Sequence, residues 1–136
     1  MFSVDLQLRF ANINKNNYIY KMELRYFTFE EFDSPDYPGS GEKFMDREFL
    51  DCLDEARDIA GVQFKITSGY RTPAHNKKVG GVTTSSHLIG RAVDIHCTHT
   101  GKRLKIIEAL SMVGFQRFGI AKTFIHVDSD DQKNPA

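Results

Sequence analysis

Residues 85–96 read SSHLIGRAVDIH, a polar turn that contains Gly90 and leads into a short apolar strand carrying an aspartate. Alternation along this strand places Ala92, Asp94 and His96 on one face. An aspartate inside a strand is unfavourable, both by strand propensity and by desolvation, unless it has a partner. We therefore expect a polar partner for Asp94 on that face of the strand.

A second strand of the same kind is expected at Phe124–Asp128, FIHVD. Alternate residues of a strand share a face, so His126 and Asp128 are expected side by side. Phe118–Ala121 precedes this strand and predicts the other arm of a closing hairpin. Phe64–Thr67 predicts a further strand earlier in the chain.

Helix signals occur in four segments. The longest follows the capping residue Asp46, places apolar residues at helical spacing and ends at Gly61. The other helices are expected from Thr28, from Thr72 to about Lys78, and from Leu104 to Val113. Residues 34–41 (SPDYPGSG) predict a loop, and residues 98–101 (THTG) predict a turn. The irregular alternation of helices and strands indicates an α+β fold, with helices packed on a small, mostly antiparallel sheet.

Length and composition favour a single globular domain. The chain has 136 residues, of which 40% are hydrophobic and 26% are charged. We assign residues 22–130 to this domain, residues 1–21 to an extension of uncertain structure, and residues 131–136 to a polar, frayed tail. The formal net charge is zero, so the sequence shows no electrostatic footprint for nucleic acid or for an anionic membrane.

The N-terminal residues 1–17 contain charged positions where a signal peptide needs an unbroken apolar core. No stretch approaches the length of a membrane span. We therefore expect a cytoplasmic product at synthesis, without an export signal. We also expect a monomer. Cys52 and Cys97 are too few for a disulfide framework, and both are expected to be buried free thiols.

Three polar residues interrupt apolar strands or glycine-punctuated turns: His87, Asp94 and His126. Two imidazoles and one carboxylate can hold a catalytic zinc ion and leave its fourth position for water. The simpler alternative is that the histidines are hydrogen-bonded core residues. In that case Asp94 would pair with Arg71 or Arg91. His75 and His99 fall in expected turns and are interpreted as surface residues.

Four motifs in the same order resemble the zinc D-alanyl-D-alanine carboxypeptidase family, which includes D,D-dipeptidases and phage L-alanyl-D-glutamate endopeptidases. Residues 85–94 (SSHLIGRAVD) match its S-x-H-x-x-G-x-A-x-D signature. Residues 68–71 (SGYR) match its arginine turn, and Asn76 with residues 79–81 (VGG) resembles the segment that follows. Residues 124–128 resemble its closing strand. The similarity spans roughly residues 24–128, and the zinc domain of Hedgehog proteins is a distant relative.

The resemblance implies a Hedgehog or D-Ala-D-Ala peptidase-like fold with one zinc ion per chain, held by His87, Asp94 and His126. It also implies that Arg71 stabilises the oxyanion. Many relatives carry a glutamate as general base three residues before the last histidine, where this chain has Thr123. Asp128 and His96 are the alternative candidates for the base, and Asp128 is preferred because it lies closer to the chain end expected to frame the cleft. Asp128 is equally a candidate for orienting a zinc ligand.

The implied function is a zinc metallopeptidase that cleaves bonds involving D-amino acids in bacterial peptidoglycan, as a carboxypeptidase or an endopeptidase. A phage or prophage lysin is the expected setting, acting on the cell wall after release or as part of a virion. The missing glutamate at Thr123 favours an alternative, a non-catalytic zinc-stabilised binding module. A phage structural protein that retains the fold is a third alternative.

Overall fold

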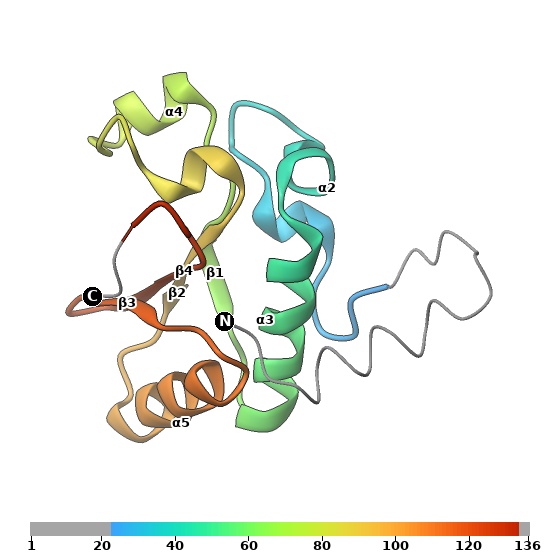
Figure 1. Cartoon of the computed structure of the whole chain (residues 1–136), viewed down its shortest axis with the longest axis vertical. Helices are drawn as coiled ribbons and strands as arrows, with labels where there is room; N and C mark the ends of the chain where they lie inside the picture. Colours follow the sequence, from blue (N-terminus) through green and yellow to red (C-terminus); the bar gives the residue numbers. More distant parts are fainter. Residues whose placement is uncertain (1–22, 134–136) are drawn as a thin grey trace.

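A computed structural model describes residues 23–133, which fold around an antiparallel sheet with the strand order β1-β2-β4-β3 (Figure 1). The strands are β1 (Lys65–Ser68), β2 (Ala92–His96), β3 (Arg117–Ile120) and β4 (Phe124–Asp128). Every adjacent pair is antiparallel, and β3 with β4 forms the expected hairpin. The α+β prediction and the four predicted strands are confirmed, with boundaries shifted by one residue at β1 and β3.

The two central strands, β2 and β4, divide the sheet into an apolar face and a polar face. Asp94 lies opposite His126, and Ala92 lies opposite Asp128. Directly paired residues project to the same side, so these polar groups share one face. The intervening pairs, Val93 with Val127 and Ile95 with Ile125, are fully buried on the other face.

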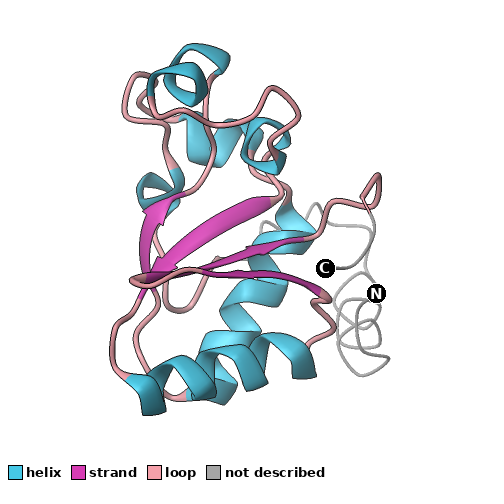
Figure 2. Cartoon of the chain, turned by 90° about the vertical axis from the view of Figure 1, so that its left-hand side faces the viewer, coloured by secondary structure: helices cyan, strands magenta, loops and turns pink. Residues whose placement is uncertain are grey.

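The apolar face is covered by α3 (Arg47–Ala60) and α5 (Thr100–Met112), which also contact each other. Figure 2 shows the long helices gathered on one side of the strands. Asp46 begins α3 by accepting the Phe49 N–H at 2.8 Å, and Gly61 ends it with a φ of 66°. Phe49 is fully buried, and burying a side chain of this size contributes roughly 1.5–3 kcal/mol.

The remaining helices are short and are η1 (Phe29–Phe32), α2 (Ser40–Phe44), α4 (Pro73–Lys78) and η2 (Ser86–Ile89). In Figure 1, α4 and α2 lie at the top and α5 lies at the bottom, with the sheet between them. The helix expected from Thr28 is the 3-10 helix η1, and Glu31 accepts the Thr28 N–H at 2.7 Å. Thr72 caps α4 as expected, by accepting the His75 N–H at 3.1 Å.

Two segments expected to be irregular contain helix. Asp33 accepts the N–H groups of Gly39 and Gly41, so the end of the expected loop 34–41 turns into α2. The expected turn at 98–101 is also partly wrong, because α5 already begins at Thr100. His99 caps this helix, its Nδ1 accepting the Lys102 N–H at 3.2 Å, and it is exposed as expected for a surface residue. The sequence analysis missed the contacts of Asp33 and His99, because a side-chain cap leaves no apolar periodicity in the sequence.

Both cysteines are free thiols, but only Cys52 is buried, whereas Cys97 is partly exposed just beyond the end of β2. The polar tail was expected to be frayed from residue 131, but it contacts the rest of the domain as far as Lys133. The Lys133 ammonium donates to the carbonyl oxygen of Thr84 at 2.8 Å and to the Ser86 hydroxyl at 3.1 Å. The proposed extension 1–21 and residues 134–136 lie outside the described residues.

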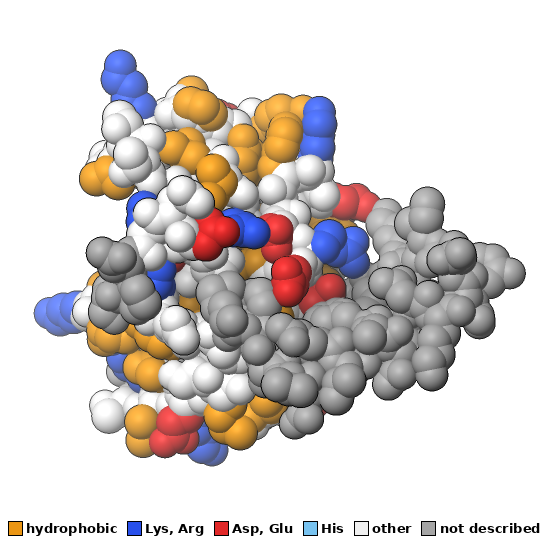
Figure 3. All heavy atoms as spheres, in the orientation of Figure 1, with side chains coloured by type: hydrophobic (Ala, Val, Ile, Leu, Met, Phe, Trp, Pro, Cys, Tyr) orange, Lys and Arg blue, Asp and Glu red, His pale blue; other side chains and the backbone are white. Residues whose placement is uncertain are grey.

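Acidic and basic side chains are interspersed on the molecular face that Figure 3 displays. This distribution agrees with the zero formal net charge of the chain. Each helix within residues 23–133 is too short or too polar to cross a bilayer.

Asp51 on α3 makes stability depend on pH. Its Oδ1 is buried without a hydrogen-bond partner among the described residues. Burial raises the pKa of Asp51 from 3.8 to about 6, although the charge of Arg47 lowers it. Because the folded-state pKa is the higher one, ionisation destabilises the fold increasingly between about pH 4 and pH 6. Asp51→Asn should raise the free energy of unfolding by about 1–2 kcal/mol at pH 7 and hardly at all at pH 4.

Urea unfolding at the two pH values measures this difference. Glu48→Gln is the matched control, because Glu48 is an exposed acid on the same helix. The control should show no comparable gain at pH 7. An equal gain for Asp51→Asn at pH 4 and pH 7 would contradict the role of ionisation.

Candidate metal centre

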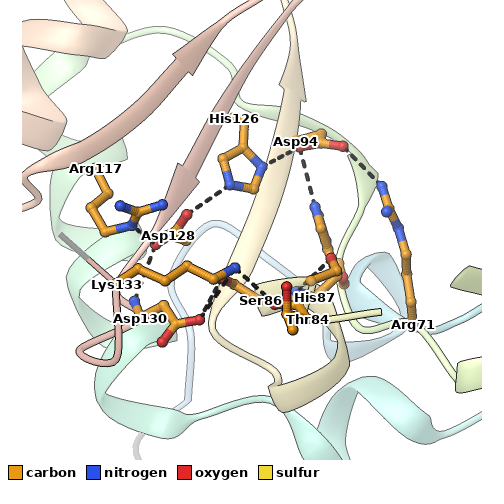
Figure 4. A network of polar contacts seen from close by, with 12 residues as sticks. Arg71, Thr84, Ser86, His87, Asp94, Arg117, His126, Asp128, Asp130 and Lys133 are labelled. Atoms are coloured by element: carbon orange, nitrogen blue, oxygen red, sulfur yellow. Dashed lines mark hydrogen bonds and ion pairs between the residues drawn. The ribbon is translucent and has the colours of Figure 1, made fainter. Parts of the chain in front are cut away.

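Three short elements bring His87, Asp94 and His126 together (Figure 4). Asp94 and His126 are the central residues of β2 and β4 and lie directly opposite each other. His87 belongs to η2, which leads into β2 through Gly90. Gly90 has a φ of 69°, and a Cβ there would lie 2.1 Å from the Phe44 carbonyl oxygen. Only glycine therefore allows this close turn, which returns the chain from His87 to the sheet.

The donor atoms of these three side chains converge on one point. His87 Nε2 lies 3.3 Å from Asp94 Oδ1, and His126 Nδ1 lies 2.9 Å from the same oxygen. One ligand atom from each residue falls within 4.8 Å of the other two. Within residues 23–133, these residues form the one group of three or more histidine, cysteine or acidic side chains that could hold a metal ion. The structure thus assembles the three residues expected as metal ligands.

Hydrogen bonds on the far sides of the two rings fix which nitrogen faces the cluster. His87 Nδ1 lies 2.7 Å from the Gly69 carbonyl oxygen, which can only accept a hydrogen bond. His126 Nε2 lies 2.9 Å from Asp128 Oδ2. These contacts leave His87 Nε2 and His126 Nδ1 facing Asp94, the arrangement in which outer partners hold metal-binding imidazoles.

The charged groups of the cluster shift one another's pKa values. Burial raises the pKa of Asp94, but hydrogen bonds from His126 and His87 outweigh it and hold that pKa well below its usual range. Burial also lowers the pKa of His126, yet hydrogen bonds to Asp128 and Asp94 raise it to about 9. The two carboxylates thus stabilise the protonated form of His126, and a metal ion bound at Nδ1 would have to replace the proton there.

Arg71 lies beside Asp94 with its guanidinium held at three nitrogens. Nη2 is 3.3 Å from Asp94 Oδ2, and Nε donates to the Ser68 hydroxyl at 2.9 Å. Nη1 donates to Asn76 Oδ1 at 3.3 Å. The ion pair considered for Arg71 and Asp94 is therefore present. Arg91 contacts other acids instead, Asp46 at 3.7 Å and Asp131 at 3.5 Å.

Asp128 lies behind His126 and is almost fully buried. Its Oδ2 contacts His126, while its Oδ1 accepts the Arg117 Nε–H at 2.7 Å and the Asp130 N–H at 3.1 Å. Burial raises the pKa of Asp128, but the hydrogen bonds from His126 and Arg117 outweigh burial, so the pKa lies below its usual value. Both oxygens of this carboxylate are therefore already engaged.

Arg117 is a contributor that the sequence analysis missed. It lies opposite Asp128 in the β3–β4 hairpin, so the two oppositely charged residues form a cross-strand pair. A predicted arm that began at residue 117 in place of Phe118 would have put Arg117 opposite Asp128.

The other two positions that bear on the general base lie outside the pocket beside the cluster. His96 is exposed at the end of β2 and lies opposite Phe124. Thr123, three residues before His126, is exposed in the β3–β4 turn. Its carbonyl oxygen accepts the Cys97 N–H at 3.0 Å. Neither residue is among those that line the pocket.

The cluster opens into a pocket of about 520 Å³. Its lining combines the three clustered residues and Arg71 with two further stretches, Gly80–Val82 on one side and Gly119–Ala121 with Phe124 on the other. Val82 and Ile120 are 65% and 58% exposed, so the pocket offers accessible apolar surface beside the polar cluster. A polar cluster within a mostly apolar pocket is typical of a ligand or active site.

Comparison with known proteins gives one family. The family model described as Peptidase M15 matches residues 26–128, which include all three clustered residues and Arg71. A search of curated proteins finds no significant match to the chain.

The geometry predicts about one zinc ion per purified chain. His87→Ala and Asp94→Ala should each lose that ion after dialysis, because each would remove one of the three side chains expected to bind it. Elemental analysis of the dialysed proteins measures the occupancy. His75→Ala is the matched control, since His75 lies on α4 outside the cluster and should leave zinc bound. Full occupancy in the first two variants would remove the site.

Proposed function

The chain belongs to the peptidase M15 family, and on this premise we propose that it cleaves peptide bonds involving D-amino acids in bacterial peptidoglycan. The proposed activity is that of a carboxypeptidase or an endopeptidase. The observation that carries it is the convergence of His87, Asp94 and His126 beside a pocket that Arg71 also lines. The proposed setting is a phage or prophage lysin, which the resemblance implies.

The donor set fits zinc. We assign His87 Nε2, His126 Nδ1 and one Asp94 oxygen as ligands of one zinc ion, because these atoms converge and the far nitrogens have other partners. A bound zinc ion supplies a Lewis acid that polarises the scissile carbonyl and lowers the pKa of water. The protein's own groups must then place the substrate and hold the charge that develops.

Arg71 is proposed to hold that charge. Its guanidinium lines the pocket and contacts Asp94, so it lies beside the proposed zinc ligands. Positive charge that is already oriented stabilises a developing oxyanion without reorganisation during the reaction. The hydrogen bonds to Ser68 and Asn76 supply this orientation.

We propose that Asp128 orients His126. Asp128 is buried, and its contacts with His126, Arg117 and the Asp130 N–H engage both of its oxygens. A carboxylate held in this way fixes the ring and tautomer of a metal-binding histidine. His96, the other residue considered as the base, is exposed and does not line the pocket. Neither residue is therefore assigned the proton transfer.

A non-catalytic zinc-stabilised binding module is the second candidate. One observation favours it, namely that Thr123 replaces the usual glutamate and lies in an exposed turn outside the pocket. A phage structural protein with the same fold belongs to this class. The open pocket and the fixed guanidinium of Arg71 favour the enzyme.

Incubation with purified peptidoglycan separates these functions. The zinc-loaded protein should release peptide fragments or single D-amino acids, which mass spectrometry identifies together with the bond that is cut. His87→Ala is the inactive control. Zinc-loaded wild type that binds peptidoglycan without releasing any fragment would favour the binding module.

Arg71→Ala should lower turnover by about a hundredfold or more while zinc remains bound, because an oxyanion donor is lost. Arg71→Lys should restore activity only in part, since an ammonium cannot reproduce the three-way contacts of a guanidinium. Turnover and zinc content of the same preparations measure the two effects. Unfolding of Arg71→Ala, with no selective loss of turnover in Arg71→Lys, would indicate a structural ion pair.

Asp128→Asn distinguishes orientation from proton transfer. If Asp128 orients His126, the variant should bind zinc about 10–100-fold more weakly, yet keep most of its turnover at saturating zinc. Chelator competition measures the zinc affinity. A general base would give the opposite result, unchanged zinc affinity with turnover about a hundredfold lower. His96→Ala should keep near wild-type turnover, and a loss of that size would identify His96 as the base.

A further inference from the structure

Asn76 is a buried amide beside the pocket, and its contact with Arg71 is only one of its two side-chain hydrogen bonds. It is 4% exposed and lies on α4, which begins directly after Arg71 and Thr72. A buried side-chain amide is costly unless its oxygen and nitrogen both find partners. Here the oxygen and the nitrogen are bonded to two different parts of the pocket lining.

The oxygen of the amide faces Arg71. Asn76 Oδ1 accepts from Arg71 Nη1 at 3.3 Å, while the other two guanidinium nitrogens contact residues of β1 and β2. A planar group held at three corners cannot swing about its last torsion angles. Asn76 is the one of the three partners that comes from α4, so it ties Arg71 to that helix.

The nitrogen of the amide faces the pocket wall formed by Gly80–Val82. Asn76 Nδ2 donates to the Val82 carbonyl oxygen at 2.9 Å, and the Asn76 backbone carbonyl accepts the Gly81 N–H at 2.8 Å. The Val82 carbonyl also accepts the Ser85 N–H at 3.0 Å. Asn76 thus holds the wall at two successive residues.

Gly81 shows how closely these groups pack. A Cβ at this position would lie 2.0 Å from Asn76 Oδ1 and 3.1 Å from Arg71 Nη1. The amide and the guanidinium occupy the space where any other residue would place its side chain. Glycine is required here for close approach, and the wall, the amide and Arg71 form one packed unit.

We propose that Asn76 is a positioning residue that couples the Gly80–Val82 wall to the orientation of Arg71. This inference rests on the proposed function, because the wall would contact the substrate and Arg71 would hold the developing charge. A substrate that fits the wall leaves the guanidinium in place, whereas one that displaces the wall also displaces Arg71. A substrate that fits the wall poorly would therefore be cleaved more slowly as well as bound more weakly.

Two substitutions separate the two halves of the amide. Asn76→Asp keeps an oxygen for Arg71 but replaces the donor to Val82 with an oxygen that repels its carbonyl. Asn76→Ala removes both contacts. The comparison between the isosteric variant and the truncated one distinguishes loss of the wall from loss of the arginine.

Two readouts do not require turnover. Hydrogen exchange of the Gly81 and Ser85 amides reports on the wall, and the NMR signal of the Arg71 Nε–H reports on the guanidinium. Asn76→Asp should exchange about tenfold faster at Gly81 and Ser85, with the Arg71 signal retained. Asn76→Ala should change both readouts. With soluble peptidoglycan fragments, Asn76→Asp should mainly raise KM, and Asn76→Ala should also lower kcat by about tenfold.

Val113→Ala is the matched control, because Val113 is buried at the end of α5 and does not line the pocket. It should lower overall stability without changing the Arg71 signal or the relative exchange at Gly81 and Ser85. Unchanged exchange and an unchanged Arg71 signal in Asn76→Ala would overturn the coupling. If wild type cleaves no fragment, the proposed function fails, while the exchange and NMR results still decide whether Asn76 couples the wall to Arg71.

Discussion

The antiparallel pairing of β2 with β4 is the constraint on which the rest of the structure depends. Its register places Asp94 opposite His126 and Ala92 opposite Asp128, so the small Ala92 leaves room beside a buried carboxylate. A slip by one residue would turn the polar groups toward α3 and α5 and expose the valines and isoleucines. The cost of burying unpaired charge and the gain from burying apolar side chains therefore select the same register.

On the polar face of the sheet, His87, Asp94 and His126 are surrounded by groups that hold them or their neighbours in place. Gly69 and Asp128 fix the two imidazoles, Arg117 and the Asp130 N–H fix Asp128, and Asn76 with Ser68 fixes Arg71. Each outer group is itself held by regular structure or by a neighbouring backbone group. This arrangement keeps several charged groups close together in a partly buried place, which requires that nearly every donor and acceptor be paired.

Much of the fold and of the candidate site could be predicted from the sequence. Alternation in residues 92–96 and 124–128 predicted both central strands and the shared face of their polar residues. The early start of α5 was missed because the capping contact of His99 carries no periodic signal. Arg117 was missed because the predicted hairpin arm began one residue too late, and Asn76 was missed because tertiary structure brings its partners close. The orientation of Asp128 also needed coordinates, because a shared strand face does not show which oxygens are engaged.

The strand order has a consequence for synthesis. Because β4 is the last described strand to be made but lies between β2 and β3, the sheet stays divided until β4 has left the ribosome. Asp94 and His126 are 32 residues apart, so the cluster has no second imidazole until β4 has been made. A nascent chain that ends before β4 therefore carries an incomplete cluster, and the three side chains can come together only once β4 pairs with β2.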